Sequence, residues 1–165
     1  MLRHNLARKA PRVRVFEWGR VFLRDASVAG SDSTVAGFHQ PMRVAGLACG
    51  PLDAAGWAND TRLVDFFDLK GDLEALLAPV QAGFAPVEHP ALHPGRSASV
   101  SVNGRSIGVV GQLHPRWRQA YELTQTPVLF ELDLDALLQP VQRLIPVRKN
   151  LFTVIAAADP ARAED

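Results

Sequence analysis

The sequence predicts an α+β fold in which an antiparallel sheet is flanked by helices. Several short segments alternate apolar and polar residues, which is typical of strands with one buried face. One segment near residue 70 instead repeats its apolar residues every three or four positions, as an amphipathic helix does. The connections between segments are mostly short, which favours antiparallel neighbours over parallel crossovers.

Length and composition indicate a globular protein with a substantial core. The chain has 165 residues, of which 47% are hydrophobic and 21% are charged. A chain of this length buries roughly 70% of the surface that it exposes when unfolded. Its single cysteine, Cys49, cannot form an internal disulfide, which favours a cytoplasmic location. No window approaches the roughly 20 apolar residues of a membrane span, so no membrane association is expected.

The net charge of +1 gives the chain no overall attraction to nucleic acid. Basic residues are nevertheless concentrated near the start: Arg3, Arg8, Lys9, Arg12, Arg14 and Arg20. A solvated helix face is the simpler explanation for this basic run. A stand-alone tRNA- or RNA-binding module that uses the run is the alternative hypothesis.

The first half of the chain predicts a helix, two strands and a long loop. Residues 1–10 are good helix formers and end at Pro11. Residues 13–21 predict a strand, and residues 43–49 predict a second strand that is buried on both faces. Residues 24–41 are small, polar and rich in glycine, which predicts a long loop.

Residues 64–80 predict an amphipathic helix that Pro79 ends. Its apolar face would consist of Phe66, Leu69, Leu73, Leu76 and Leu77. The carboxylates Asp65, Asp68 and Asp72 lie near its start, where they stabilise the positive end of the helix dipole. Gly71 costs about 1 kcal/mol relative to alanine. It indicates close approach by another element, unless the glycine is merely tolerated.

The second half predicts a hairpin, a helix and a strand. Asn103-Gly104 favours a two-residue type I′ turn, because both central residues need a positive φ. This turn would pair Val102 with Arg105, Val100 with Ile107, and Ala98 with Val109, with the serines on the opposite face. Pro115 predicts a helix start. Residues 128–134 alternate as a strand does.

Catalytic and ligand-binding patterns are weak. His89, His93, His114 and Asp68 could form a zinc site, and a metal-dependent hydrolase is a third hypothesis. However, a proline follows each of the three histidines and disfavours helical geometry there, so no metal is expected. Gly95-Arg96 lacks the pattern of a phosphate loop, and Arg96 is expected to form a structural ion pair or a partner contact. Cys49 lies in an apolar strand pattern, which predicts a buried, inert thiol.

Five segments in a fixed order carry a more specific signal across roughly residues 3–140. They read "NLARKAPRVRVFEWGRVF", "VDFFDLKGDLEALL", "HPALHPGRSASV", "GRSIGVVGQLHP" and "LFELDLDALL". Together they resemble the beta subunit of bacterial phenylalanyl-tRNA synthetase, in its catalytic-like core domain near the C-terminal end. The resemblance implies an antiparallel core like that of class II aminoacyl-tRNA synthetases. It assigns residues 1–145 to this core and residues 146–165 to a linker or truncated C-terminal tail.

The resemblance also implies a role in translation. The family enzyme is a heterotetramer of two alpha and two beta subunits, and it attaches phenylalanine to its tRNA with ATP and magnesium. The alpha subunit carries the active site. A working class II site needs an arginine in its second motif and a glycine-rich third motif that ends in arginine. "RVRVFEWG", which contains Arg14 and Glu17, does not match the second motif, and Gly111 is followed by Gln112-Leu113-His114-Pro115.

The chain is therefore expected to be inactive alone and to support assembly with the alpha subunit, with no catalytic residue, cofactor or metal of its own. Seven residues are expected to contact alpha or to brace loops: Glu17, Trp18, Asp68, Lys70, His93, Arg96 and His114. The Trp18 ring is expected to be buried or at that interface. Residues 145–165 do not match the expected linker to an anticodon-binding domain.

Overall fold

The computed structural model describes residues 2–53 and 62–137, and within these ranges its named elements are three helices and eight strands, with residues 134–137 also helical after the last strand. In chain order they are α1 (Leu2–Ala7), β1 (Val13–Arg20), β2 (Leu23–Arg24), β3 (Phe38–His39), β4 (Met42–Cys49), α2 (Phe66–Leu77), β5 (Ala82–Pro86), β6 (Leu92–Val102), β7 (Arg105–Leu113), α3 (Pro115–Ala120) and β8 (Val128–Asp133). The predicted α+β class is confirmed. The likeness to a class II synthetase core stays a prediction.

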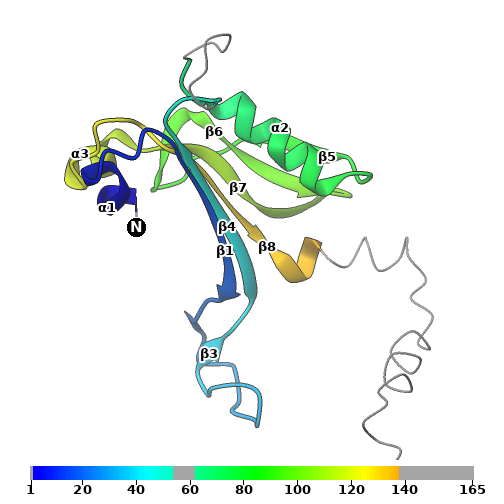
Figure 1. The fold of residues 1–165 in the computed structure, drawn as a ribbon. Helices are drawn as coiled ribbons and strands as arrows, with labels where there is room; N and C mark the ends of the chain where they lie inside the picture. Colours follow the sequence, from blue (N-terminus) through cyan, green and yellow to red (C-terminus); the bar gives the residue numbers. More distant parts are fainter. Residues whose placement is uncertain (1, 54–61, 138–165) are drawn as a thin grey trace, which may run out of the picture.

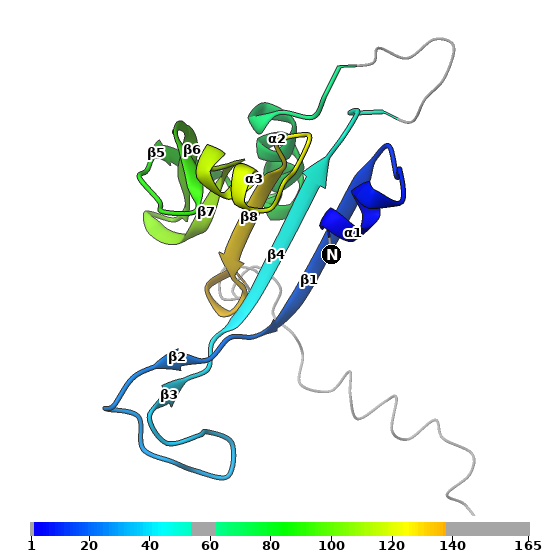
Figure 2. The ribbon, with the colours of Figure 1, turned by 90° about the vertical axis from the view of Figure 1, so that its left-hand side faces the viewer.

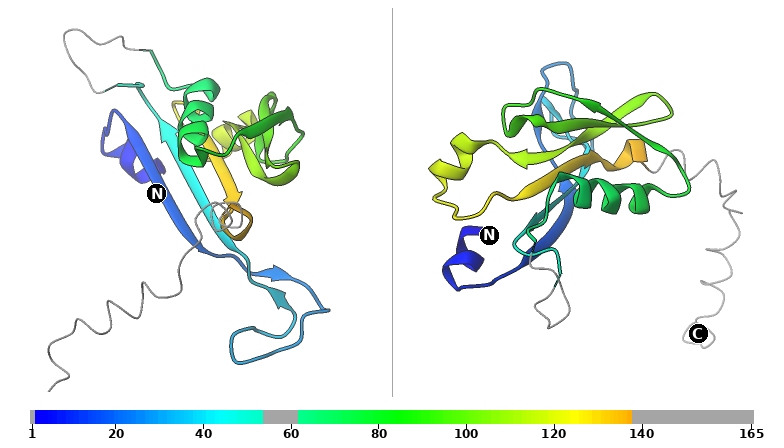
Figure 3. Two further views of the ribbon diagram at one scale, coloured as in Figure 1. Left: turned by 90° about the vertical axis from the view of Figure 1, so that its right-hand side faces the viewer. Right: turned by 90° about the horizontal axis from the view of Figure 1, so that it is seen from above.

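Six of the strands form one antiparallel sheet in the order β1-β4-β8-β7-β6-β5. α2 lies on one face of this sheet, where it packs against β7 and β8 (Figure 3). The short helices α1 and α3 lie together at one end of the sheet (Figure 1), and the ion pair between Arg3 and Glu122 connects α1 to the segment after α3. Within the described ranges, no helix is long and apolar enough to cross a membrane.

The predicted helix near residue 70 is α2, and its first turn is fixed by a capping box. The Asp65 carboxylate accepts hydrogen bonds from the backbone N–H groups of Phe67 and Asp68 at 2.8 and 3.2 Å. The Asp68 carboxylate accepts from the N–H of Asp65 at 2.8 Å. These bonds satisfy donors that a helix start leaves unpaired, so the predicted position of Asp65 and Asp68 at this end is confirmed. The prediction is wrong for Asp72, which lies in the middle of α2 and pairs with Arg14.

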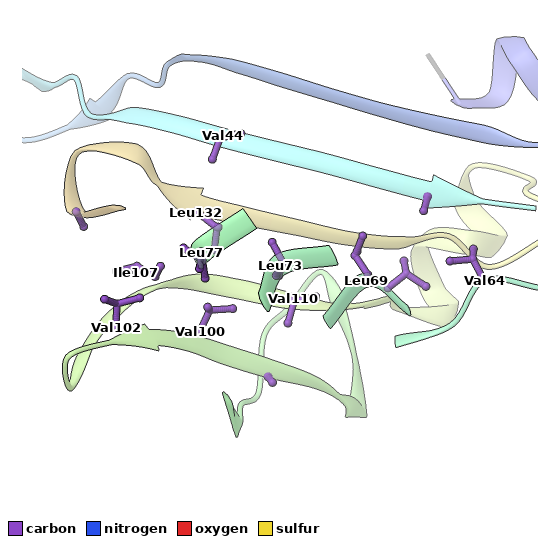
Figure 4. Close-up of a cluster of buried hydrophobic side chains, with 14 residues drawn as sticks. Val44, Val64, Leu69, Leu73, Leu77, Val100, Val102, Ile107, Val110 and Leu132 are labelled. Carbon is purple, nitrogen blue, oxygen red and sulfur yellow. The ribbon is translucent and has the colours of Figure 1, made fainter. Parts of the chain in front are cut away.

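The core lies between α2 and the sheet (Figure 4). α2 contributes three buried leucines: Leu69, Leu73 and Leu77. The sheet contributes aliphatic side chains from its central strands, among them Val100, Val110 and Leu132. The predicted apolar face of the helix is wrong at Leu76, which is 56% exposed because it points along the sheet toward β1 rather than into the core.

Gly71 has no neighbour that would need its missing side chain. A Cβ atom built there meets nothing within 4 Å outside the helix, so the expected close approach is wrong and the glycine is merely tolerated. Replacing Gly71 with alanine is therefore expected to raise the free energy of unfolding by about 0.5–1 kcal/mol, because alanine loses less backbone entropy in a helix. Chemical denaturation of the two proteins checks this, and a less stable Gly71→Ala protein would contradict it.

The β6–β7 hairpin has the predicted turn but not the whole predicted register. Asn103 and Gly104 have φ angles of 51° and 76°, as a type I′ turn requires, and Val102 pairs with Arg105. The register then shifts, so the predicted pairs Val100 with Ile107 and Ala98 with Val109 are wrong. The observed pairs are Val100 with Gly108 and Ala98 with Val110. Ile107 is the extra residue of a β-bulge, which lets both Ile107 and Val110 enter the core.

The predicted loop over residues 24–41 forms an arm outside the main sheet. Its ends pair as β2 and β3, and the segment extends away from the six-stranded sheet (Figure 2). The strand predicted at residues 43–49 is β4. Its residues are buried at alternate positions and half-buried between them, so the prediction of full burial on both faces is only partly right.

Candidate subunit interface

The seven residues expected from the sequence do not form one site. Glu17 and Trp18 lie on β1 at the edge of the sheet, and their side chains point to opposite faces because they are adjacent in a strand. Asp68 and Lys70 lie on α2. The remaining three, His93, Arg96 and His114, lie where β6 begins and β7 ends.

Asp68 has the most complete set of contacts among the seven. Arg62 donates to both of its carboxylate oxygens, at 2.7 and 2.6 Å, and only 13% of the Asp68 side chain is exposed. The hydrogen bonds from Arg62 hold the pKa of the Asp68 carboxyl below its usual value. The sequence did not point to Arg62, because nothing in the local pattern marks a loop arginine as the partner of a helix cap.

The ionised form of Asp68 is expected to stabilise the fold in a pH-dependent way. Because its pKa is lower in the folded state, the stabilisation is present above the unfolded pKa and is lost as the pH falls through the folded pKa. Asp68→Asn should therefore be less stable than the wild type at pH 7. The difference should shrink below about pH 4. Urea denaturation of both proteins across this range checks it, and a difference that is independent of pH would contradict it.

Lys70 lies on α2 and is half-buried. Its ammonium group forms an ion pair with Glu74 one turn later and lies 4.7 Å from the centre of the Phe84 ring on β5. The contact with Phe84 is a cation–π interaction that connects the helix to the far edge of the sheet. These contacts position the side chain, but whether Lys70 also meets another subunit stays a prediction.

The three residues at the end of β6 and β7 form local contacts. The Nδ1 atom of His114 accepts a hydrogen bond from the Arg116 N–H at 3.0 Å, so His114 caps α3. Arg96 donates to the Gln112 side chain at 3.0 Å, which is a hydrogen bond rather than the expected ion pair. His93 contacts the carbonyl oxygen of Pro94. Such contacts are what loop bracing requires, and a contact with another subunit stays a prediction.

The zinc pattern considered for the histidines is not assembled. His89 accepts a hydrogen bond from the N–H of Ala91 at 3.3 Å, and His114 caps α3. Asp68, on α2, accepts a hydrogen bond from Arg62, which precedes the helix. In residues 2–53 and 62–137, no three histidine, cysteine, aspartate or glutamate side chains are placed to hold a metal ion. Cys49 is buried as predicted, and burial raises the pKa of its thiol, which disfavours the reactive thiolate.

An apolar groove that the sequence did not predict is a candidate binding surface. It lies between α2 and β1 on the helix-covered face of the sheet and has a volume of about 640 Å³. Its lining includes Phe16, Trp18, Val44, Leu69, Leu73, Leu76, Phe130, Leu134 and Leu137. We call this surface the α2/β1 groove. Arg14 and Asp72 form an ion pair at 3.1 Å within it.

Trp18 and Phe16 give the α2/β1 groove its exposed aromatic wall. Trp18 is 66% exposed, so the expectation that this chain buries its ring is wrong. Phe16 is 70% exposed, and the two ring centres are 6.3 Å apart. The register explains this arrangement, because Phe16 pairs with Gly46 and Trp18 with Val44, so both rings point to the face that α2 covers only in part. Adjacent exposed aromatic residues are typical of protein-binding surfaces.

The basic residues near the start of the chain largely have partners within the chain. Arg3 and Arg14 form ion pairs with Glu122 and Asp72. Arg12 and Arg20 donate to backbone carbonyl oxygens at 3.2 and 3.0 Å. These interactions use donors that a nucleic-acid site would direct toward phosphates. No contact in the described ranges favours the RNA-binding alternative.

Comparison with known proteins identifies the family. A family described as "Phenylalanyl tRNA synthetase beta chain CLM domain" matches residues 1–134. Curated relatives named phenylalanine-tRNA ligase beta subunit include one from Cupriavidus pinatubonensis, 62% identical over 82% of this chain, and one from Burkholderia lata, 53% identical over 96%. A third, from Chromobacterium violaceum, is 48% identical over 96% of the chain. This chain belongs to the phenylalanine-tRNA ligase beta subunit family.

The chain spans about a fifth of the length of these relatives, covering 17% of the Cupriavidus protein and 20% of the other two. The Burkholderia alignment omits 4% of the chain, which is about 7 residues, so the similarity continues into residues 146–165. Residues 138–165 lie outside the described part of the structure. The division of the chain after residue 145 therefore stays a prediction.

Proposed function

We propose that this chain is a non-catalytic structural core of the phenylalanine-tRNA ligase beta subunit, and that it acts by assembling with the alpha subunit. The complete enzyme would attach phenylalanine to its tRNA with ATP and magnesium. The α2/β1 groove is the observation that carries the proposal, because a beta-subunit family member exposes an apolar groove with an aromatic wall. Binding would remove a large apolar area of Trp18 and Phe16 from contact with water, which favours association.

The placement of Arg14 and Glu17 supports the non-catalytic part of the proposal. They lie in the strand that resembles the second class II motif, but three residues apart in a regular strand, so they point to opposite faces. Arg14 is also held by Asp72 and lies 3.4 Å from the carbonyl oxygen of Leu52. Because these contacts hold Arg14 on one face of the sheet, it cannot bind the same nucleotide as Glu17, which points to the other face.

Two matched substitutions on α2 test the proposed surface. Leu76 lines the groove, whereas Phe67 is 74% exposed on the same helix and lies outside it. Leu76→Lys is expected to weaken binding to the alpha subunit of a relative by roughly tenfold or more, whereas Phe67→Lys should leave it nearly unchanged. Calorimetric titration measures both affinities. Equal affinities for Leu76→Lys and wild type would place the alpha-binding surface elsewhere.

Catalysis is tested separately with phenylalanine-dependent exchange between ATP and pyrophosphate. The chain alone is expected to show no exchange above background, and the alpha subunit should supply the active site when both are present. Exchange by the purified chain alone, proportional to its concentration, would overturn the non-catalytic part of the proposal.

A further inference from the structure

The last described turn of the chain lines the α2/β1 groove. Leu134 and Leu137, which follow β8, both contribute side chains to its wall. The turn is helical, and the Asp133 carboxylate caps it by accepting a hydrogen bond from the N–H of Ala136 at 2.9 Å. Ala136 is 5% exposed and belongs to the core. The chain therefore leaves for residue 138 from a fixed position beside the groove.

The groove presents apolar surface that the described residues leave in contact with water. Phe16, Trp18 and Leu76 line it, and each is more than half exposed. Covering these side chains stabilises any apolar segment that can reach them. A segment of the same chain reaches them at a high effective concentration, because the last described turn holds its start beside the groove.

The sequence that follows continues the apolar pattern of this turn. Leu134, Leu137, Val141 and Leu144 follow one another at steps of three, four and three residues, which is the spacing of one helix face. We call these four residues the apolar stripe. Pro140 bends or interrupts a regular helix, but it leaves the two apolar positions beyond it one turn apart. The positions between the stripe residues are mostly polar: Asp135, Gln139, Gln142 and Arg143.

We propose that residues 138–145 occupy the α2/β1 groove while the alpha subunit is absent, with Val141 and Leu144 against Trp18 and Leu76. These residues lie outside the described part of the structure, so the support is their sequence pattern and the position of the turn before them. A separate partner would have to make the same apolar contacts without the tether. The alpha subunit would then displace the segment, a consequence that rests on the proposed function.

Labelling of a cysteine in the groove tests this docking in the full 165-residue chain. Leu76→Cys places a thiol in the groove, and the native Cys49 is buried, so a maleimide reports on the introduced thiol. Leu144→Asp is expected to raise the labelling rate of this thiol roughly threefold, because a carboxylate on the apolar stripe leaves the groove open in more of the chains. Gln142→Asp adds the same charge off the stripe and should leave the rate unchanged.

Phe67→Cys provides the control position, since Phe67 is exposed on the same helix but lies outside the groove. Leu144→Asp should not change the labelling rate there, and circular dichroism establishes that each variant is folded. Equal labelling of Leu76→Cys with and without Leu144→Asp would overturn the proposal. So would an equal increase at Phe67→Cys, because it would indicate a general loosening of α2. Protection of Leu76→Cys that grows with protein concentration would overturn it in favour of a second copy in the groove.

Titration with the alpha subunit separates this proposal from the proposed function. If alpha binds in the groove, Leu144→Asp should raise its affinity by the same factor as the labelling rate, because both report the fraction of chains with an open groove. This gain is smaller than the loss of roughly tenfold or more expected for Leu76→Lys, so it does not cancel that loss. Faster labelling without a change in alpha affinity would support the docking and place the alpha-binding surface elsewhere. Unchanged labelling would overturn the docking whether or not alpha binds.

Discussion

Replacing Leu73 with alanine is expected to lower the free energy of unfolding by about 3–5 kcal/mol. Leu73 is 1% exposed and points from α2 into the cluster that contains Val110 and Leu132 (Figure 4). The substitution removes apolar contacts and leaves a cavity that the sheet, held by its hydrogen-bond ladders, fills only in part. Because α2 supplies three buried leucines to this core, loosening it exposes the centre of the sheet.

Leu76→Ala is the matched control, since it removes the same atoms from the same helix at an exposed position. Its expected effect on stability is within about 0.5 kcal/mol. Urea denaturation measures both. Equal losses for the two variants would mean that Leu73 is not the main contact between α2 and the sheet.

Gly108→Ala is expected to destabilise the fold by about 3 kcal/mol, at the upper end of what overpacking costs. A Cβ atom at Gly108 would lie 2.1 Å from the carbonyl oxygen of Glu131 and 2.8 Å from the Cα atom of Leu132. Both are backbone atoms of β8, so no side chain can rotate away, and β7 and β8 must separate in the middle of the sheet. Thermal unfolding checks this.

The control for Gly108→Ala is the same substitution at Gly71, where space is open and stabilisation is expected. A Gly108→Ala protein as stable as the wild type would mean that β7 and β8 can shift without cost. In that case the close approach of the two strands beside the bulge at Ile107 would not require a glycine.

Local patterns predicted the elements of this fold because each element is determined by near neighbours in sequence. The leucine spacing and the aspartates at residues 65 and 68 predicted α2 and its cap, and Asn103-Gly104 predicted the turn between β6 and β7. The alternation at residues 128–134 predicted β8, with Val128 and Leu132 fully buried.

Features that depend on contacts between distant segments could not be predicted in this way. The bulge at Ile107 arises because Ile107 and Val110 both find space beneath α2, which the hairpin sequence alone does not reveal. Trp18 was expected to be either buried or at the interface with alpha, and its sequence neighbours could not decide between the two. Its exposure follows from the position of β1 at the sheet edge, which is a property of strand order.

The candidate surface was anticipated at one residue only. Trp18 was expected at an interface, and it does line the α2/β1 groove, but Leu76 and Phe130 join it from segments that lie about 60 and 110 residues further along the chain. The pairing of β1 with β4 and of β4 with β8 brings them together. A single sequence shows that these residues are apolar, but it does not show that they lie close together in the fold.

The central claim is that this chain assembles with the alpha subunit of phenylalanine-tRNA ligase. Size-exclusion chromatography of the chain mixed with the alpha subunit of one of the Burkholderia relatives, at micromolar concentration, tests it most directly. We predict that both polypeptides elute together, earlier than either alone. Two separate peaks at the positions of the isolated proteins would contradict it.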